Sequence, residues 1–233
     1  MLRGAVALWT LLCASEACAQ VSGSVTLVSD YRYRGISLSD GQPTAQLSIA
    51  YDRPDGWYTG AFASRVQFRP RSSDETQLLT YLGYARRTGG GLSWELGAEY
   101  AAFTGRYDYD YPEVYVGLAS DRIGGRIYYA RRYYGMDAPQ VYAELNGAHE
   151  LSDRLRLLAH LGWSRHNGSG RTTYGTDRHR FDARLGIGAV LDGFDLQLAW
   201  VTTDGSDDAY APIPPIGSGA ANQTWVLSLS RSW

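Results

Sequence analysis

The strongest constraint on the fold is a series of about twelve segments in which apolar and polar residues alternate. Each is close to the ten residues that a tilted membrane strand needs. Residues 92–103 are the clearest case, because Leu92, Trp94 and Leu96 share one face while Glu95 and Glu99 share the other. The expected strands are 21–34, 44–52, 57–68, 78–86, 92–103, 113–120, 126–134, 140–151, 155–166, 178–191, 194–203 and 223–233.

The connections between these segments alternate in length. Every second connection is a short turn, and the others are mostly longer and richer in charge, Gly and Tyr. The short turns are 53–56, 87–91, 121–125, 152–153 and 192–193. Outer-membrane barrels combine short periplasmic turns with long external loops, whereas a soluble β-sandwich has no reason for this asymmetry. The sequence therefore predicts an all-β fold, a transmembrane antiparallel up-and-down β-barrel of about twelve strands; a secreted sandwich is the alternative.

The first residues have the pattern of a secretory signal. Arg3 precedes an apolar run over residues 5–14, and residues 17–19 form a small-x-small cleavage site. We expect a signal peptide at 1–19 and one barrel domain at 20–233. Both cysteines, Cys13 and Cys18, fall in the signal segment, so the mature chain has no disulfide or thiol chemistry. A signal peptide on a barrel predicts the outer membrane of a Gram-negative bacterium.

All 22 basic residues are arginine, and the formal net charge is −2. This balance gives no electrostatic footprint for nucleic acid. Arginine keeps its charge and offers a rigid fork of donors, which suits fixed networks in a confined lumen. The bias of a high-GC genome is an alternative explanation of the missing lysine.

Rings near the strand ends predict aromatic girdles at both membrane interfaces. The expected girdle residues are Tyr31, Tyr33, Trp94, Tyr100, Trp163, Trp200, Trp225 and Trp233. The last strand alternates up to the final residue, Trp233, and resembles the assembly signal of bacterial outer-membrane proteins. The partners expected from these features are outer-membrane lipid, lipopolysaccharide and the barrel-assembly machinery.

Residues 28–37, VSDYRYRGIS, followed by 40–43, DGQP, resemble the opening motif of the TorF family, a proteobacterial family of porin-like proteins formerly carried as a domain of unknown function. Residues 56–64, 111–115 and 158–163 and the terminal strand also look like this family. The resemblance covers nearly the whole mature chain. It implies an outer-membrane channel and supplies no ligand.

In a barrel, the polar face of each strand lines the lumen. The expected lumen residues are Asp30, Arg32, Arg34, Arg65, Gln67, Arg86, Glu95, Glu99, Glu113, Arg126, Arg132, Glu144, Arg156, His160, Arg180, Asp182, Arg184, Asp195 and Gln197. Rings of charge set selectivity in pores, so these residues predict a narrow porin-like channel for small polar or anionic solutes. The alternative is that arginines and acids pair across the lumen as structural plugs.

Two other functions are alternatives to a channel. An outer-membrane lipid-modifying enzyme needs a nucleophile beside a base, but His160 and Ser164 lie about 13 Å apart along a strand. No histidine spacing repeats a metal motif, so we expect no enzyme, no cofactor and no metal. The acidic loops 108–113 and 204–208 are read as solvated charges rather than as sites for divalent cations. A barrel that serves as an anchor, with its function in the loops, is the remaining alternative.

Overall fold

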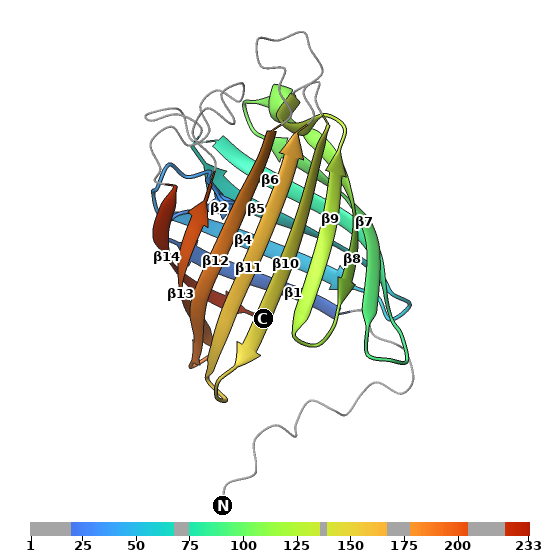
Figure 1. The fold of residues 1–233 in the computed structure, drawn as a ribbon, viewed down its shortest axis with the longest axis vertical. Coiled ribbons are helices and arrows are strands. Elements are labelled where there is room, and N and C mark those ends of the chain that lie inside the picture. Colours follow the sequence, from blue (N-terminus) through green and yellow to red (C-terminus); the bar gives the residue numbers. More distant parts are fainter. Residues whose placement is uncertain (1–19, 68–74, 136–138, 167–177, 205–221) are drawn as a thin grey trace, which may run out of the picture.

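The computed structural model describes residues 20–67, 75–135, 139–166, 178–204 and 222–233. Within these ranges, twelve antiparallel strands form a closed barrel, in which the first strand pairs with the last (Figure 1). The strands are β1 (Gln20–Val28), β4 (Thr44–Asp52), β5 (Trp57–Val66), β6 (Glu75–Arg87), β7 (Ser93–Phe103), β8 (Tyr111–Ala119), β9 (Ile123–Ala130), β10 (Gln140–Glu150), β11 (Leu155–His166), β12 (Arg178–Leu191), β13 (Phe194–Thr203) and β14 (Gln223–Ser232). The predicted fold class is confirmed, whereas the predicted signal peptide lies outside the described residues.

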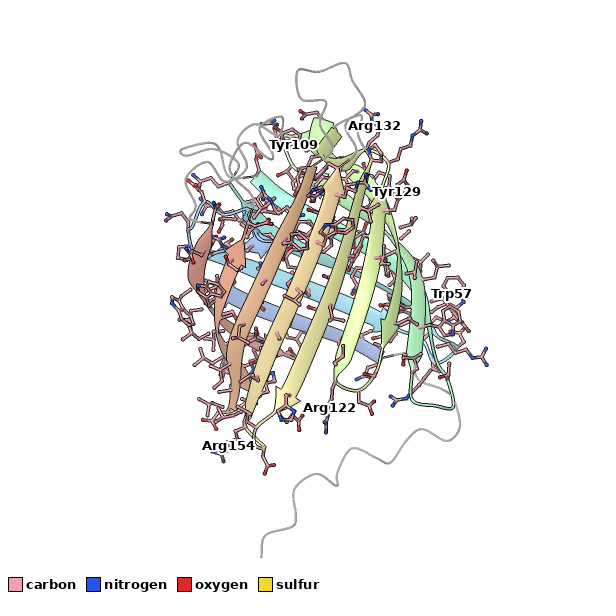
Figure 2. The ribbon with its side chains drawn as sticks, viewed as in Figure 1. Trp57, Tyr109, Arg122, Tyr129, Arg132 and Arg154 are labelled. Atoms are coloured by element: carbon pink, nitrogen blue, oxygen red, sulfur yellow. The ribbon has the colours of Figure 1, made fainter. Side chains whose placement is uncertain are left out.

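The short turns gather at the lower end of the barrel in Figure 1, and the long connections gather at the upper end. In Figure 2, Arg122 and Arg154 mark the short-turn end, and Tyr109 and Arg132 mark the long-loop end. The tightest turn is Asp192-Gly193, where both residues have positive φ (50° and 80°), as a two-residue hairpin requires. The alternation of connection lengths along the chain therefore becomes an asymmetry between the two ends.

The outer surface of the barrel is apolar. On β7, Leu96 is 57% exposed, and its register partner Val116 on β8 is 53% exposed. The acid Glu113, on the opposite face of β8, is 1% exposed. This inverts the order of a water-soluble protein and matches a barrel whose outside contacts lipid. Among the described residues, no helix is long and apolar enough to cross a membrane.

Six of the predicted girdle residues occupy outward positions. Trp94, Tyr100, Trp225 and Trp233 are exposed; Trp163 and Trp200 lie opposite the exposed rings of Phe181 and Trp225 in the strand register. Trp94 and Trp233 are near the short-turn end of their strands, and the other four are near the long-loop end.

The prediction that the first strand runs to Arg34 is wrong, because β1 ends at Val28. Residues 29–43, which we call the inward segment, leave the barrel wall and enter the lumen. They include a small hairpin, β2 (Arg32–Tyr33) and β3 (Ile36–Ser37). Tyr31 and Tyr33 are therefore not girdle residues: Tyr31 is 7% exposed, and both rings line a cavity inside the barrel.

The expectation that Arg65 lines the lumen is also wrong. Phe62 packs against Tyr31 inside the barrel, with ring centroids 5.6 Å apart, and Val66 is fully buried. A strand alternates its side chains, so Arg65 faces outward. Its place at the long-loop end of β5 lets a long charged side chain reach water beside the membrane.

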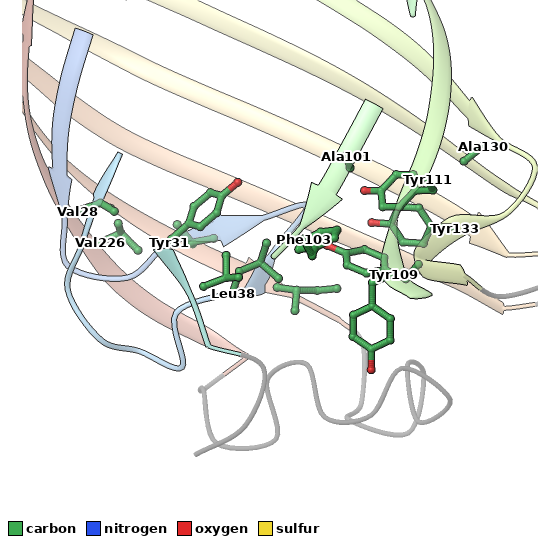
Figure 3. Packing of buried hydrophobic residues seen from close by; sticks show 14 residues of the cluster. Val28, Tyr31, Leu38, Ala101, Phe103, Tyr109, Tyr111, Ala130, Tyr133 and Val226 are labelled. Atoms are coloured by element: carbon green, nitrogen blue, oxygen red, sulfur yellow. The ribbon is translucent and has the colours of Figure 1, made fainter. Parts of the chain in front are cut away.

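The buried apolar cluster lies at the long-loop mouth and not along the barrel axis. Figure 3 shows Tyr109, Tyr111 and Tyr133 close to Phe103, with Leu38 of the inward segment nearby. Two short 3-10 turns, η1 (Tyr107–Tyr109) and η2 (Tyr133–Gly135), bring rings into this cluster. The described loops thus pack the mouth with aromatic side chains.

Candidate functional site

Polar contacts within the inward segment hold it in shape. The Asp30 carboxylate accepts hydrogen bonds from the hydroxyls of Ser37 at 2.5 Å and Ser39 at 3.2 Å, and from Nε of Arg32 at 2.7 Å. Arg34 and Gly35 have positive φ (51° and 79°), which turns the chain back on itself. Asp30 and Arg32, which follow the alternating pattern of a strand in the sequence, therefore bond to one another inside the lumen.

Arg34 ties the tip of this segment to the opposite wall. Its two terminal nitrogens donate to the two carboxylate oxygens of Glu113 on β8, at 3.0 and 2.6 Å. The side chains of this pair are 4% and 0% exposed. Four tyrosine rings surround the guanidinium at 4.5–5.5 Å from their centroids: Tyr33, Tyr128, Tyr133 and Tyr142.

The charge of Arg34 is secured by its surroundings. Burial alone would lower the pKa of Arg34, but Tyr33, Glu113 and Tyr133 raise the pKa well above its ordinary value. The pair is a fork-to-carboxylate contact, which is the strongest geometry for an arginine. Because a buried charge without its partner is costly, this contact fixes the inward segment across the lumen.

A second acid lies beside this pair. Glu99 on β7 is the cross-strand register partner of Glu113, and the hydroxyl of Tyr33 donates to Glu99 at 3.4 Å. Two carboxyl groups therefore face one arginine.

The inward segment bounds a polar cavity of about 580 Å³ within the barrel. Residues 30–35 form one boundary. The walls carry charged side chains from β10 to β12, including Glu144, His160 and Arg184, and neutral polar side chains from β1, β4 and β14. The cavity brings charged, neutral polar and aromatic side chains together inside the barrel, and it is the candidate functional site.

Other lumen charges are paired. Arg126 donates to Glu95 at 2.5 and 3.1 Å, and the Tyr58 hydroxyl donates to the same carboxylate at 2.6 Å. Arg156 donates to Asp195. In both ion pairs, the arginine and the acid come from strands that lie two apart in the barrel, so the charges pair along the lumen wall.

His160 belongs to a polar network. Its Nε2 lies 2.9 Å from Asp182, and its Nδ1 lies 2.7 Å from the side-chain oxygen of Asn146. Tyr142 reaches both His160 and Asp182 at 3.2–3.5 Å. No nucleophilic hydroxyl other than a tyrosine takes part in these contacts, and the described residues include no group of three His, Cys, Asp or Glu that could hold a metal ion.

Most of the expected lumen residues face inward or enter the lumen with the inward segment. The acids, arginines and histidine among them are Asp30, Arg32, Arg34, Glu95, Glu99, Glu113, Arg126, Glu144, Arg156, His160, Arg180, Asp182, Arg184 and Asp195. Their role in selectivity remains a prediction.

Three arginines do not line the lumen. Arg65 faces outward, as shown above. Arg86 lies opposite the outward ring of Trp94, one residue before the end of β6. Arg132 follows β9 and is exposed at the long-loop end (Figure 2). Without these three, the expected lumen residues include fewer arginines than acids.

The neutral polar wall of the cavity is absent from the residues expected in the lumen. Thr26, Gln46, Ser228 and Ser230 line it, and their alternating positions contained the signal, because each shares a face with inward residues of its strand. The inward tyrosines, such as Tyr128, had no such signal, since tyrosine occurs on both faces of this barrel.

Comparison with known proteins supports the architecture. Residues 13–233 match the model of a family described as a bacterial protein of unknown function, Gcw_chp. No curated protein sequence matches. Structures of the KdgM porin, alone and in complex with disordered oligogalacturonate, have TM-scores of 0.53 and 0.52 at 8% identity, and cover 93% of this chain and 99% of theirs. A NanC porin structure has a TM-score of 0.54 at 8% identity, and covers 91% of this chain and 98% of its own. At this identity the likeness is one of fold.

Proposed function

We propose that this chain, which belongs to the Gcw_chp family of bacterial proteins of unknown function, is a porin-like channel for small polar or anionic solutes. The observation that carries the proposal is the polar cavity of about 580 Å³ inside a closed barrel with an apolar exterior. A structural anchor has no need of such a cavity, because the interior of a small barrel is normally filled by side chains.

The inward segment gives the channel its constriction. It enters the lumen from the long-loop end and is tied by Arg34 to Glu113 on the opposite wall. Solutes that pass must go around this segment or displace it. We therefore expect a small conductance that depends on the state of the Arg34–Glu113 contact.

The proposal places the chain in the outer membrane of a Gram-negative bacterium. The apolar exterior fits a lipid environment, and the terminal strand fits recognition by the barrel-assembly machinery. The resemblance of residues 28–43 to the TorF family, and the porin fold of KdgM and NanC, agree with this placement. Lipid and lipopolysaccharide are the partners proposed for the outer surface.

Planar-bilayer recording of the purified, refolded protein tests the function. We expect discrete current steps, and a reversal potential in a salt gradient that reports no preference for cations. Silence together with lipid hydrolysis would support an enzyme, and silence without hydrolysis would support an anchor. A clear cation preference would contradict the part of the proposal that concerns anions.

A further inference from the structure

Arg184 differs from the lumen arginines that form ion pairs with acids. Arg32, Arg34, Arg126 and Arg156 each contact a carboxylate. Arg184 donates one hydrogen bond, from Nη2 to Oε1 of Gln197 at 3.0 Å, and its Nε has no partner. Among the described residues, no carboxylate lies within the 4.0 Å that defines an ion pair with Arg184. Its positive charge is therefore not neutralised by contact, although it lines the cavity.

The position of Arg184 places it between two different walls. On one side, its register partner His160 belongs to the charged network with Asp182. On the other side, the Gln197 side chain accepts from Arg184 and donates through Nε2 to Asp195 at 3.0 Å, so both ends of its amide are bonded. Gln197 is the register partner of Ser228, and from there the cavity wall continues through β14, β1 and β4 with neutral polar side chains: Ser228, Ser230, Thr26 and Gln46.

This neutral wall offers hydroxyl and amide groups to a ligand. Thr26 and Ser230 bond to each other at 3.1 Å, and each hydroxyl keeps further capacity. The structure records no hydrogen bond from the side chains of Gln46 or Ser228 to any described residue. A line of donors and acceptors without charge complements the hydroxyl groups of a solute.

We propose that the cavity holds a binding site for a hydroxylated monocarboxylate, with the carboxylate on Arg184 and the hydroxyls along Ser228, Ser230, Thr26 and Gln46. One guanidinium matches one carboxylate. A dianion such as a phosphate monoester would need a second free cation, and Arg32 and Arg34, which also line the cavity, are already paired. The inference rests on the proposed channel function, since it names the solute class that the channel would admit.

Saturation-transfer NMR on the refolded protein in micelles tests the site without requiring conductance. The probes are gluconate and sorbitol, which have the same carbon chain and differ in the terminal carboxylate. We expect gluconate to bind about tenfold more tightly, because a hydrogen bond to a charged group contributes that much. R184Q should bring the two probes to equal affinity.

The matched control is R126Q. It removes one lumen arginine and the same charge, but Arg126 pairs with Glu95, and neither residue lines the cavity. R126Q should keep the gluconate preference, whereas a loss equal to that of R184Q would mean that bulk lumen charge is responsible and would overturn the site. R184K keeps the charge but loses the two-pronged contact of the guanidinium, so it should reduce the gluconate preference without abolishing it. This reduction tests the site if R184Q does not fold, and an unchanged preference in R184K would overturn it.

The two proposals fail separately. Gluconate preference without current steps would retain the site and overturn the channel. Current steps with equal binding of gluconate and sorbitol to the native protein would retain the channel and overturn the site.

Discussion

At the scale of single residues, Arg34 holds the inward segment against the opposite wall of the lumen. Its guanidinium and the Glu113 carboxylate are almost fully buried and bond through two parallel contacts. Removal of one partner from a buried pair is far more costly than removal of a surface pair, because the other charge stays in a medium of low dielectric. The pair therefore acts as a tether for the inward segment.

We expect R34Q to release the inward segment from the opposite wall. The variant leaves Glu113 buried without its cation, which costs about 3–5 kcal/mol. Limited proteolysis from the long-loop side should cut residues 29–43 faster than in the native protein, and bilayer recordings should show a larger conductance.

R53Q is the control for that experiment. Arg53 pairs with Asp55 in a turn at the short-turn end, with the two side chains 55% and 49% exposed, so its loss costs at most about 1 kcal/mol. Equal protease sensitivity of R34Q, R53Q and the native protein would show that Arg34 is not a tether.

At the scale of elements, glycine and tyrosine are paired across neighbouring strands. Gly60 lies opposite Tyr81, and Gly97 lies opposite Tyr115. A Cβ on either glycine would fall 2.3 Å from an atom of the tyrosine side chain. The ring covers the glycine backbone inside the lumen. Such pairing of an aromatic ring with a glycine helps to fix the register of neighbouring strands.

We expect G97V to destabilise the barrel by about 1–3 kcal/mol, because the new methyl groups displace the Tyr115 ring from a well-packed site. The shift also breaks the hydroxyl contact of 2.8 Å between Tyr115 and Tyr58. Urea unfolding in micelles, followed by tryptophan fluorescence, measures the change.

The same substitution at Gly147 provides the comparison. A Cβ there has its nearest neighbour at 3.8 Å, the backbone oxygen of Arg122, which is ordinary contact. G147V should stay within about 0.5 kcal/mol of the native protein. Equal losses for G97V and G147V would mean that strand glycines are restricted for backbone reasons and not by the tyrosine rings.

At the scale of the whole molecule, closure depends on a short seam. β1 and β14 have register partners only over residues 24–28 and 228–232, whereas β1 pairs with β4 over residues 20–28. Trp233 extends the seam: its backbone exchanges two hydrogen bonds with Gly23, at 3.0 and 3.1 Å, and its ring lies against that glycine. The last residue therefore helps to close the barrel.

We expect W233A to lower the yield of closed barrel on refolding into vesicles, because the ring contact on Gly23 is lost at about 1–2 kcal/mol. The folded fraction can be measured from the mobility of unheated samples on a gel. W225A removes a lipid-facing ring from the other end of the same strand and should reduce the yield less. Equal yields of closed barrel for W233A and W225A would mean that both rings contact lipid and neither helps to close the barrel.

The sequence by itself determined the barrel and its sidedness. Alternation with a period of two records which side chains face outward, and connection lengths record which end of the barrel carries the short turns. The strands from residue 140 onward begin and end within one residue of expectation. Residues 29–34 continue the same alternation, yet the tertiary structure takes them out of the wall. Alternation describes two environments, and it is equally satisfied when Asp30 bonds to Ser37 and Ser39 inside the lumen. The partner that holds Arg34 there, Glu113, lies 79 residues away, and only the closed barrel brings the two together.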